Sequence, residues 1–319
     1  MSADLVLVLT GGIGGAKLCL GLQRVLPAES LHIVVNTGDD FEHLGLRICP
    51  DIDTTMYTLS GLSNPELGWG RRDETWSFMR ALGSLGGETW FQLGDADLAL
   101  HVERTRRLAG GESLSAVTRD IAARLGVPAI VYPMSDSPVS TIVTTPEGEL
   151  GFQDYFVRRR CAPVVTALSF QGAEGAKVPT AVGELFRDPR LRAVVIAPSN
   201  PYLSIDPLLA VPGMRALLRD SGAPVIAVTP LIGDAAVKGP TAKIMRELGI
   251  TPSPLAIVEH YRGLIDGFVL DSRDAALAQH IDLPVQVCDT LMVSLEDRER
   301  VAASVLELAA RLSQPERSR

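Results

Sequence analysis

LVLVLTGGIGGAKL, at residues 5–18, is the stretch that decides the fold. Its first five residues are all Leu or Val, which is typical of a strand buried on both faces of a sheet. A threonine, four glycines around one isoleucine, and the start of a helical pattern follow directly. A buried strand that passes through a glycine-rich turn into a helix is the first half of a βαβ unit. The stretch therefore predicts an α/β protein with a mainly parallel sheet.

Six more short apolar runs follow along the chain and alternate with helical patterns. This alternation is typical of repeated βαβ units. We expect a single α/β domain over residues 1–319, in which helices flank the sheet. The seven predicted strands are Leu5–Leu9, His32–Val35, Pro128–Tyr132, Ala193–Ala197, Pro224–Val228, Gly267–Leu270 and Pro284–Val287.

Two segments depart from this alternation. Residues 54–125, approximately, have longer helical periods broken by glycines, and predict a helical insertion that caps the sheet. Residues 140–157 combine the alternating TIVTT, a PEGE turn and GFQDYFV, and predict a small β-hairpin. The polar end of the chain, SQPERSR at 313–319, is predicted to be disordered. The insertion also holds the three tryptophans of the chain, Trp69, Trp76 and Trp90.

The size and charge of the chain exclude several classes of protein. With 319 residues and 46% hydrophobic content, the chain can bury a large core. Its 38 acidic residues exceed its 30 basic ones and it has no run of Lys or Arg longer than three residues, so we expect no nucleic-acid binding. No apolar stretch approaches the roughly 20 residues that span a bilayer, and no signal peptide is recognisable. We therefore expect a cytoplasmic protein without a membrane partner.

The glycine loop, TGGIGG at residues 10–15, has the composition of a phosphate-binding turn. Glycines allow the backbone to approach a phosphate closely, and the free N–H groups at a helix N-terminus favour an anion. Lys17, one turn into the helix, adds a positive charge. The spacing matches neither GxxxxGK[ST] nor GxGxxG, so it does not name a nucleotide. A tight turn that requires glycine for steric reasons alone is the alternative.

Acidic residues follow at two places near the second strand. Asp39 and Asp40 belong to NTGDD, and Asp51 and Asp53 belong to CPDID. Because the carboxyl ends of neighbouring parallel strands face one crevice, these carboxylates can lie beside the glycine loop. Carboxylates next to a phosphate site suggest Mg²⁺. The alternative is that Asp39 and Asp51 only cap helices.

Further polar segments come where apolar runs end. LGDADLALH at 93–101 carries Asp95 and Asp97 at the start of a helical pattern, and by itself is typical of a helix cap. PMSDSPV at 133–139, APSNP at 197–201 and TPLIGDAAVKGPTAK at 229–243 each follow a predicted strand. Together they supply the hydroxyl and amide groups that a nucleotide pocket requires.

The motifs of covalent catalysis are missing from the sequence. It has no GxSxG, no HExxH and no protein-kinase motifs, and its five histidines are scattered. The residues alone therefore predict an α/β enzyme that binds a nucleotide or another phosphate ester with Mg²⁺, for transfer or hydrolysis at phosphorus.

The ordered set of motifs resembles the 2-phospho-L-lactate transferase family of coenzyme F-420 biosynthesis. The resemblance runs from about Leu5 to Met292 and so covers nearly the whole chain. Each motif alone is weak, but their common order is specific. The motifs are TGGIGGAKL, VNTGDD, GLRICPDIDTTMYTL, GWGRRDETW, WFQLGDADLALH, PMSDSPVST, APSNPYLSI, LIGDAAVKGPTAKIM and CDTLM.

The resemblance implies a Rossmann-like core, a homodimer and a Mg²⁺-dependent transfer of a substituted phosphate group. The donor would be a guanosine diphosphate ester of lactate or of its enolpyruvyl or glyceryl counterpart. The acceptor would be the deazaflavin alcohol Fo, whose hydroxyl attacks the phosphorus next to the acid and releases GMP. Such a reaction needs positioning and charge neutralisation more than a protein nucleophile, which agrees with the residues present.

The resemblance also implies roles for individual residues. Asp53 would orient or deprotonate the attacking hydroxyl, and Asp40 would be the second catalytic residue. The residues expected to contact the donor are Gly11, Gly12, Gly14, Gly15, Lys17, Ser135, Asp136, Ser199, Asn200 and Pro201. Those expected at the acceptor are Asp53, Gln92 and Asp95, and those expected to bind the metal are Asp39, Asp40 and Asp53.

This sequence departs from the family pattern at two positions. Gln92 stands where relatives often have Lys or Arg, and Asp234 stands where they more often have a small or amide residue. The first difference puts a cationic contact to the acceptor in doubt, and the second affects the donor pocket. Two other functions stay open: a nucleotidyltransferase that uses GTP or a sugar nucleotide, and a non-catalytic nucleotide-binding regulator.

Overall fold

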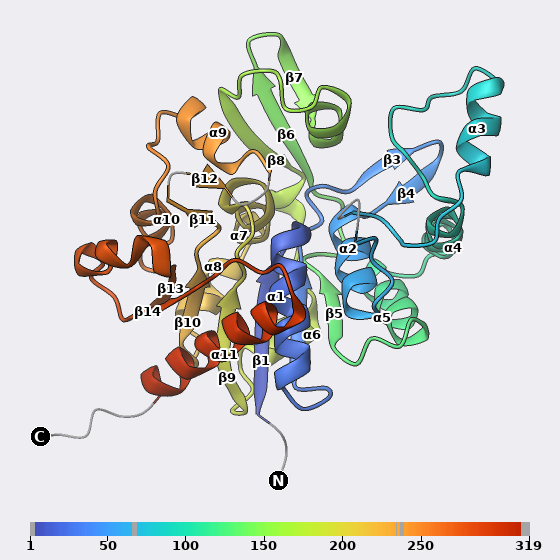
Figure 1. Cartoon of the computed structure of the whole chain (residues 1–319). Helices are drawn as coiled ribbons and strands as arrows, with labels where there is room; N and C mark the ends of the chain where they lie inside the picture. The colour runs from blue at the N-terminus through green and yellow to red at the C-terminus, as the bar shows by residue number, and fades with distance from the viewer. Residues whose placement is uncertain (1–3, 66–68, 234, 237–238, 314–319) are drawn as a thin grey trace, which may run out of the picture.

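A parallel sheet of seven strands forms the centre of the protein (Figure 1). The computed structural model describes residues 4–65, 69–233, 235–236 and 239–313. All seven strands predicted from apolar runs are confirmed, each shifted by no more than a few residues. They are β1 (Leu5–Thr10), β2 (Leu31–Val35), β5 (Ile130–Pro133), β9 (Leu191–Ile196), β10 (Val225–Val228), β13 (Gly267–Asp271) and β14 (Val285–Cys288).

The order of the strands creates one switch point in the sheet. The order across the sheet is β14, β13, β10, β9, β1, β2, β5, and every pair is parallel. The chain moves outward from β1 through β2 to β5 and then returns to β9, on the other side of β1. Ligands of open α/β sheets bind at the carboxyl ends of the strands where the order reverses. The predicted Rossmann-like α/β fold is confirmed. The glycine loop follows β1 and so lies at this switch point.

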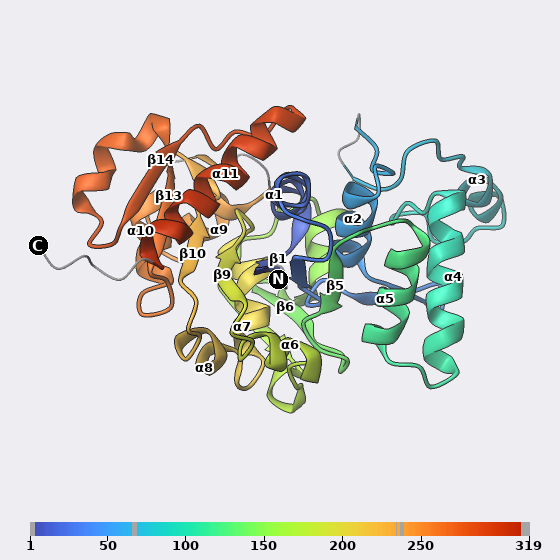
Figure 2. The same ribbon diagram turned by 90° about the horizontal axis from the view of Figure 1, so that it is seen from below.

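Helices cover both faces of the sheet (Figure 2). The side chains of β1 divide between the two cores that these helices form with the sheet. Val6 and Val8 pack on the face that carries α1 (Gly12–Val25), α2 (Pro50–Leu59), α5 (Leu114–Arg124) and α11 (Leu295–Leu312). Leu5, Leu7 and Leu9 belong to the core on the other face. That core includes residues of α6 (Thr180–Leu185), η3 (Pro201–Ile205), α7 (Asp206–Ala210), α8 (Met214–Arg219), α9 (Thr241–Glu247) and α10 (Pro254–His260).

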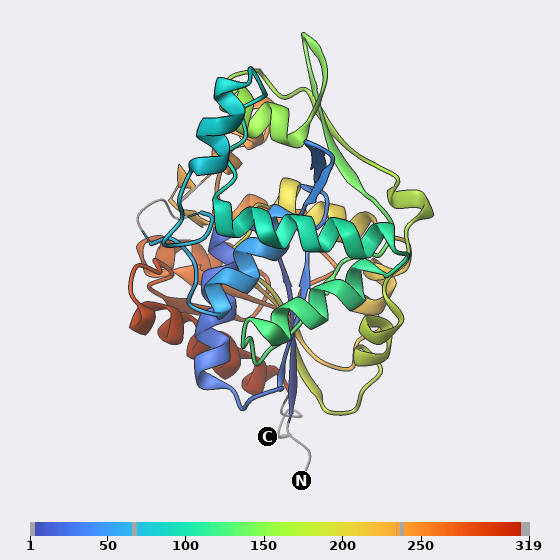
Figure 3. The same cartoon turned by 90° about the vertical axis from the view of Figure 1, so that its right-hand side faces the viewer.

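The predicted insertion at 54–125 is helical, but it is only part of the structure that lies outside the sheet. Here α3 (Ser77–Ser84) and α4 (Asp95–Ala109) pack with a hairpin of β3 (Phe41–His43) and β4 (Leu46–Ile48) around a small separate core (Figure 3). The hairpin precedes the predicted segment, because strands of three residues leave no clear alternation in the sequence. The end of α2 and all of α5 pack on the sheet instead.

The small β-hairpin is confirmed as β6 (Ser140–Thr145) and β7 (Gly148–Gly151), and β8 (Ala167–Gln171) adds a third strand that was not predicted. The second arm was predicted too long. It ends at Gly151 because Phe152 and Tyr155, spaced as on a helix, turn into the core, and Asp154–Arg158 forms the π-helix η1. The remaining elements are η2 (Ala173–Gly175), β11 (Leu231–Ile232), β12 (Ala235–Ala236) and η4 (Ser272–His280).

Two further expectations concern the chain end and the membrane. The N–H of Ser313 still donates to the carbonyl of Ala309 at the end of α11, and the predicted tail beyond it, 314–319, lies outside the described residues. Within the described ranges, none of the helices has the length and apolar character needed to cross a membrane.

Candidate active site

A cavity of about 630 Å³ opens at the carboxyl ends of the strands, at the switch point between β1 and β9. The glycine loop, the first turn of α2, the segment after β9 and aromatic side chains of the insertion and of η1 line it. Nine residues predicted for the site are among its lining residues: Gly11, Gly12, Gly14, Lys17, Asp39, Asp53, Gln92, Ser199 and Asn200.

The backbone of the glycine loop has a shape that other residues cannot adopt without strain. Gly12 has φ +66°, in the left-handed region that disfavours side chains. A Cβ atom on Gly14 would lie 2.6 Å from the carbonyl oxygen of Pro198, at the end of β9. The loop thus needs glycine both for its own conformation and for its contact with the neighbouring strand end.

Ser199 fastens the glycine loop to the segment after β9. Its Oγ accepts from the N–H of Gly11 at 3.2 Å and donates to the carbonyl of Gly11 at 2.7 Å. Asn200 beside it uses its Oδ1 to accept from the backbone of Tyr202 and Leu203 at the start of η3. Its buried Nδ2 has no hydrogen-bond partner among the described residues. Ser199 therefore shapes the loop, while the Asn200 amide leaves a donor for a ligand.

Two buried carboxylates, Asp39 and Asp51, meet at the cavity wall. The side-chain Nδ2 of Asn36 donates to Asp39 Oδ1 at 3.0 Å and to Asp51 Oδ2 at 2.9 Å. Asp51 also accepts from the backbone N–H of Gly12. Burial raises the pKa of Asp51 to about 6, and burial together with the charge of Asp51 raises the pKa of Asp39 well above its ordinary value. Within the described ranges, neither carboxylate forms an ion pair with a basic side chain.

Asp40 points away from this pair. It is buried, it forms an ion pair with Arg47 at 3.2 Å, and it is not among the described residues that line the cavity. Burial raises the pKa of Asp40 to about 7, although the Arg47 guanidinium opposes the rise. The structure thus separates Asp40 from Asp39, its neighbour in the sequence.

Asp53 lines the cavity and is compensated by a buried cation. Arg104 on α4 donates to both of its carboxylate oxygens. His101, one turn earlier on α4, brings Nδ1 to 3.6 Å from Asp53 and Nε2 to 3.3 Å from Asp97. Tyr57 donates to Asp97 at 2.6 Å. Burial raises the pKa of Asp53, and Arg104 opposes that rise.

The side chains around Asp53 form a group that could hold a metal ion. Asp53, Asp97 and His101 each offer one ligand atom, and these atoms lie within 4.8 Å of one another. Arg104 already neutralises the carboxylate of Asp53, however, and lies beside His101 at 3.5 Å. A divalent cation next to a guanidinium is disfavoured. The pair of Asp39 and Asp51 is the more favourable site for a cation.

The end of the cavity toward the insertion is aromatic. Trp69, Trp90 and Phe91 line it together with Phe152 and Phe156 from the segment around η1. Phe91 contacts Phe41 edge-on, with 4.8 Å between ring centroids. Trp76 belongs instead to the small core of the insertion. Gln92, which is exposed, also lines this end, and its Nε2 donates to the carbonyl of Thr89 at 2.7 Å.

This chain matches the family model described as "2-phospho-L-lactate transferase CofD" over residues 6–307. The chain belongs to the CofD family. The resemblance that the sequence motifs indicated is thereby confirmed, and with it a transferase of this type that acts on small molecules.

Individual CofD-family proteins are similar over almost their whole length. A phosphoenolpyruvate transferase of Streptomyces griseus is 39% identical over 313 residues, which cover 95% of this chain and 98% of the relative. A 2-phospho-L-lactate transferase of Methanosarcina acetivorans is 38% identical over 306 residues, which cover 95% of this chain and 98% of the relative. A solved structure of a UPF0052-family protein from Bacillus halodurans shares the fold, with a TM-score of 0.65, 14% identity and coverage of 96% of this chain and 99% of that one.

Six of the predicted site residues are not among the described residues that line the cavity: Gly15, Asp40, Asp95, Ser135, Asp136 and Pro201. Asp95 accepts from the N–H groups of Ser77 and Phe78 and so caps α3. Asp136 accepts from the N–H of Ser115, in the first turn of α5. Asp234, the second departure from the CofD-family pattern, lies outside the described residues.

Some residues of the site were given no individual role by the sequence. Asp51 belonged to the acidic residues that suggested Mg²⁺, with helix capping as the alternative, and the CofD-family resemblance assigned no role to Tyr57, His101 or Arg104. For the last two, the only sequence indication is the spacing HxxR, which places both side chains on one face of a helix.

Lys17 lines the cavity and contacts the segment before α11. Its Nζ donates to the carbonyl of Met292 at 2.7 Å. Met292 and Thr290, from the CDTLM motif, also line the cavity. Lys17 therefore ties this motif to the first turns of α1, close to the glycine loop.

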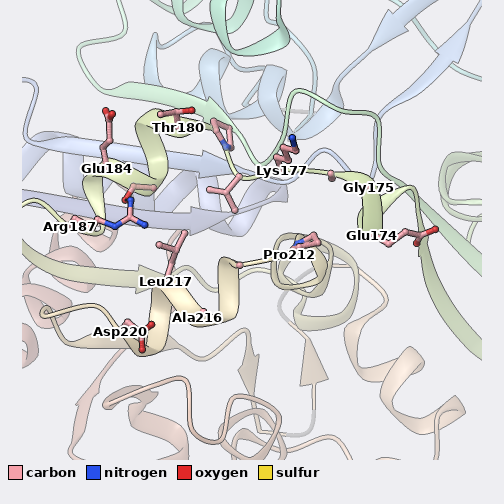
Figure 4. A pocket seen from close by; sticks show the side chains of 15 residues that line it. Glu174, Gly175, Lys177, Thr180, Glu184, Arg187, Pro212, Ala216, Leu217 and Asp220 are labelled. Atoms are coloured by element: carbon pink, nitrogen blue, oxygen red, sulfur yellow. The ribbon is translucent and has the colours of Figure 1, made fainter.

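A second hollow, of about 730 Å³, has no lining residue in common with the candidate active site (Figure 4). The turn around η2, α6 and α8 surround it, with Lys177, Glu184, Arg187 and Asp220 among its lining residues. None of the residues predicted for the CofD-family site is among them. The sequence motifs therefore indicate that the cavity at the switch point, and not this hollow, is the candidate active site.

Replacement of Gly12 by valine tests the glycine loop. A β-branched residue at φ +66° is strained by about 1–3 kcal/mol, and the shifted N–H groups should weaken binding of GDP at least about tenfold. Calorimetry with GDP and a melting curve measure both effects. Gly222→Val, at an exposed glycine with open space around its Cβ position, is the control. Unchanged GDP affinity in folded Gly12→Val would mean that the loop does not contact the diphosphate.

Proposed function

We propose that this CofD-family transferase acts in coenzyme F-420 biosynthesis, a role that its relatives support. It transfers a phospho-hydroxyacid group from a guanosine diphosphate ester to the hydroxyl of Fo, with Mg²⁺, and releases GMP. We infer a cytoplasmic homodimer, as in the family. One observation carries the proposal: the glycine loop, a pair of buried carboxylates and an aromatic wall line the same cavity.

The donor diphosphate fits the side of the cavity that the glycine loop forms. Glycines at the N-terminus of α1 let the backbone approach the phosphates, and the helix dipole favours their charge. Asn200, whose buried Nδ2 has no hydrogen-bond partner among the described residues, is also among the residues that line this cavity. Lys17 provides a cation that the diphosphate would share with the carbonyl of Met292.

Asp39 and Asp51 would hold the Mg²⁺ ion. Their oxygens are the ligand type that Mg²⁺ prefers, and among the described residues only neutral donors bond to them. Asp40 and Asp53, the other predicted ligands, each have an arginine partner. When bound, Mg²⁺ neutralises charge on the donor phosphates.

Asp53 would act on the acceptor. The aromatic wall offers a stacking surface for the flat deazaflavin ring, and Asp53 lies in the same cavity. Asp53 would accept the proton of the Fo hydroxyl while the hydroxyl oxygen of Fo bonds to the phosphorus next to the hydroxy acid. The bond from that phosphorus to the bridging oxygen breaks, and GMP leaves with that oxygen. The products are a phosphodiester of Fo and GMP.

The reaction is tested by incubating the protein with Fo, Mg²⁺ and each of the three guanosine donors, which carry lactyl, enolpyruvyl or glyceryl groups. We expect a phosphodiester of Fo and one GMP for each product formed, read by mass spectrometry. A nucleotidyltransferase would release pyrophosphate instead. No product with any donor would contradict the proposal.

The proposed metal site predicts that the stabilisation of the folded protein by Mg²⁺ depends on pH. Folding raises the pKa of Asp51 to about 6 and that of Asp39 well above its ordinary value. The folded protein therefore binds more protons than the unfolded chain from about pH 4 upward, and the contribution of these two carboxyl groups to stability falls as pH rises through their folded-state pKa values. Mg²⁺ needs the ionised carboxylates, so it should raise the melting temperature more at about pH 8 than at about pH 5.

Two variants complete this measurement. Asp51→Asn should remove most of the Mg²⁺ effect on the melting temperature, whereas Asp282→Asn, at an exposed position, should leave it unchanged. An equal effect of Mg²⁺ on wild type and Asp51→Asn would exclude Asp51 as a ligand.

With Gln92 in place of a cationic residue, we expect weaker binding of the acceptor Fo than a cation at this position would give. A neutral hydrogen bond contributes about 0.5–1.5 kcal/mol and a charged one about 1.5–3 kcal/mol. Gln92→Arg should therefore tighten Fo binding several-fold without changing donor affinity, as measured by deazaflavin fluorescence. Gln171→Arg, on exposed β8, serves as the control. Equal dissociation constants for Fo would show that Gln92 does not face the acceptor.

A further inference from the structure

Arg104 is the largest of the almost completely buried side chains in the described part of the protein, with an exposed fraction of 1%. It lies on α4 in the insertion, and it is not among the described residues that line the cavity. A buried guanidinium is unfavourable unless a carboxylate and further acceptors compensate it. Its partners therefore show what this residue does.

The main partner is Asp53, which does line the cavity. Arg104 Nη1 donates to Asp53 Oδ2 at 3.1 Å, and Nη2 donates to Oδ1. Two parallel hydrogen bonds from a planar guanidinium fix the plane of a carboxylate as well as its distance. Arg104, which does not line the cavity, thus sets the orientation of the Asp53 carboxylate, which does.

A second set of contacts fixes Arg104 itself. Its Nη1 also donates to the carbonyl of Arg47 on β4, at 3.3 Å. Thr105, the next residue of α4, accepts from the N–H of Arg47 at 2.8 Å. Helix α4 and strand β4 therefore hold the guanidinium between them, and His101 packs beside it at 3.5 Å. Arg104, 51 residues from Asp53 in the sequence, thus determines where the carboxylate of Asp53 points.

We propose that Arg104 is a positioning residue for the transfer: it holds Asp53 toward the acceptor hydroxyl, and it acts on turnover through Asp53 alone. This inference rests on the proposed function, because the orientation of Asp53 matters only if a hydroxyl reacts in this cavity. The assay with wild-type protein and the three donors tests that function by itself. The variants below test the role of Arg104 in the active enzyme.

Arg104→Lys keeps the positive charge but replaces the two-point contact by a single ammonium group. We expect a folded protein with KM values for donor and acceptor within about twofold of wild type and kcat lower by about 10²-fold, as misplaced reacting groups typically cause. Arg107→Lys is the matched control on the same helix, because Arg107 pairs with Glu112 and Asp120 and should leave both constants unchanged.

Two results would overturn the proposal: a folded Arg104→Lys enzyme with wild-type kcat, or one in which KM rises and kcat does not fall. If Arg104→Lys does not fold, Thr105→Val replaces it. That variant removes the bond from the N–H of Arg47 to the Thr105 hydroxyl, together with the bond from this hydroxyl to the carbonyl of His101 on the same helix. It should lower kcat several-fold at unchanged KM. An unchanged kcat in Thr105→Val would then limit Arg104 to the stability of the fold and contradict the proposal.

Discussion

The site depends on one amide group that holds two buried carboxylates together. Asn36 donates through a single Nδ2 to Asp39 and to Asp51, and its third contact, to the carbonyl of Leu203, joins this cluster to η3. Two carboxylates this close, and buried, raise each other's proton affinity. Such a pair is stable when protonated or when a cation lies between its members. The proposed Mg²⁺ would thereby lie at the carboxyl edge of the sheet next to the glycine loop, since Gly12 donates to the same Asp51.

The four neighbouring acids differ in how the protein compensates their charge. Asp40 and Asp53 each have an arginine, whereas Asp39 and Asp51 have only neutral donors among the described residues. This difference divides the proposed chemistry in two. The sheet provides the uncompensated pair and the glycine loop for the donor. The insertion provides Arg104 and, with the segment around η1, the aromatic wall, which belong with the acceptor. The small core of the insertion keeps that half in place.

Much of the fold could be predicted from the sequence, because strands buried on both faces are continuous apolar runs. The strands β3, β4 and β8 could not: the first two have three residues each, and β8 alternates in burial without a fully buried side chain. In the site, the glycine loop and Asp39 were predicted to lie together from the topology alone. Arg104 was not predicted, because HVERTRR resembles a solvent-exposed helix face and only the packing of α4 against α2 and β4 shows that its fourth residue is buried. Asp95 and Asp136, in contrast, have the composition of site residues but act as caps.

Crystals grown with GDP and Mn²⁺, measured at the manganese absorption edge, test the central claim most directly. Mn²⁺ accepts the same oxygen ligands as Mg²⁺ and can be located by its anomalous scattering. We predict one peak within bonding distance of carboxylate oxygens of both Asp39 and Asp51, next to the diphosphate at the glycine loop. A peak among Asp53, Asp97 and His101, the other group able to bind a metal, with none at Asp39 and Asp51, would contradict it.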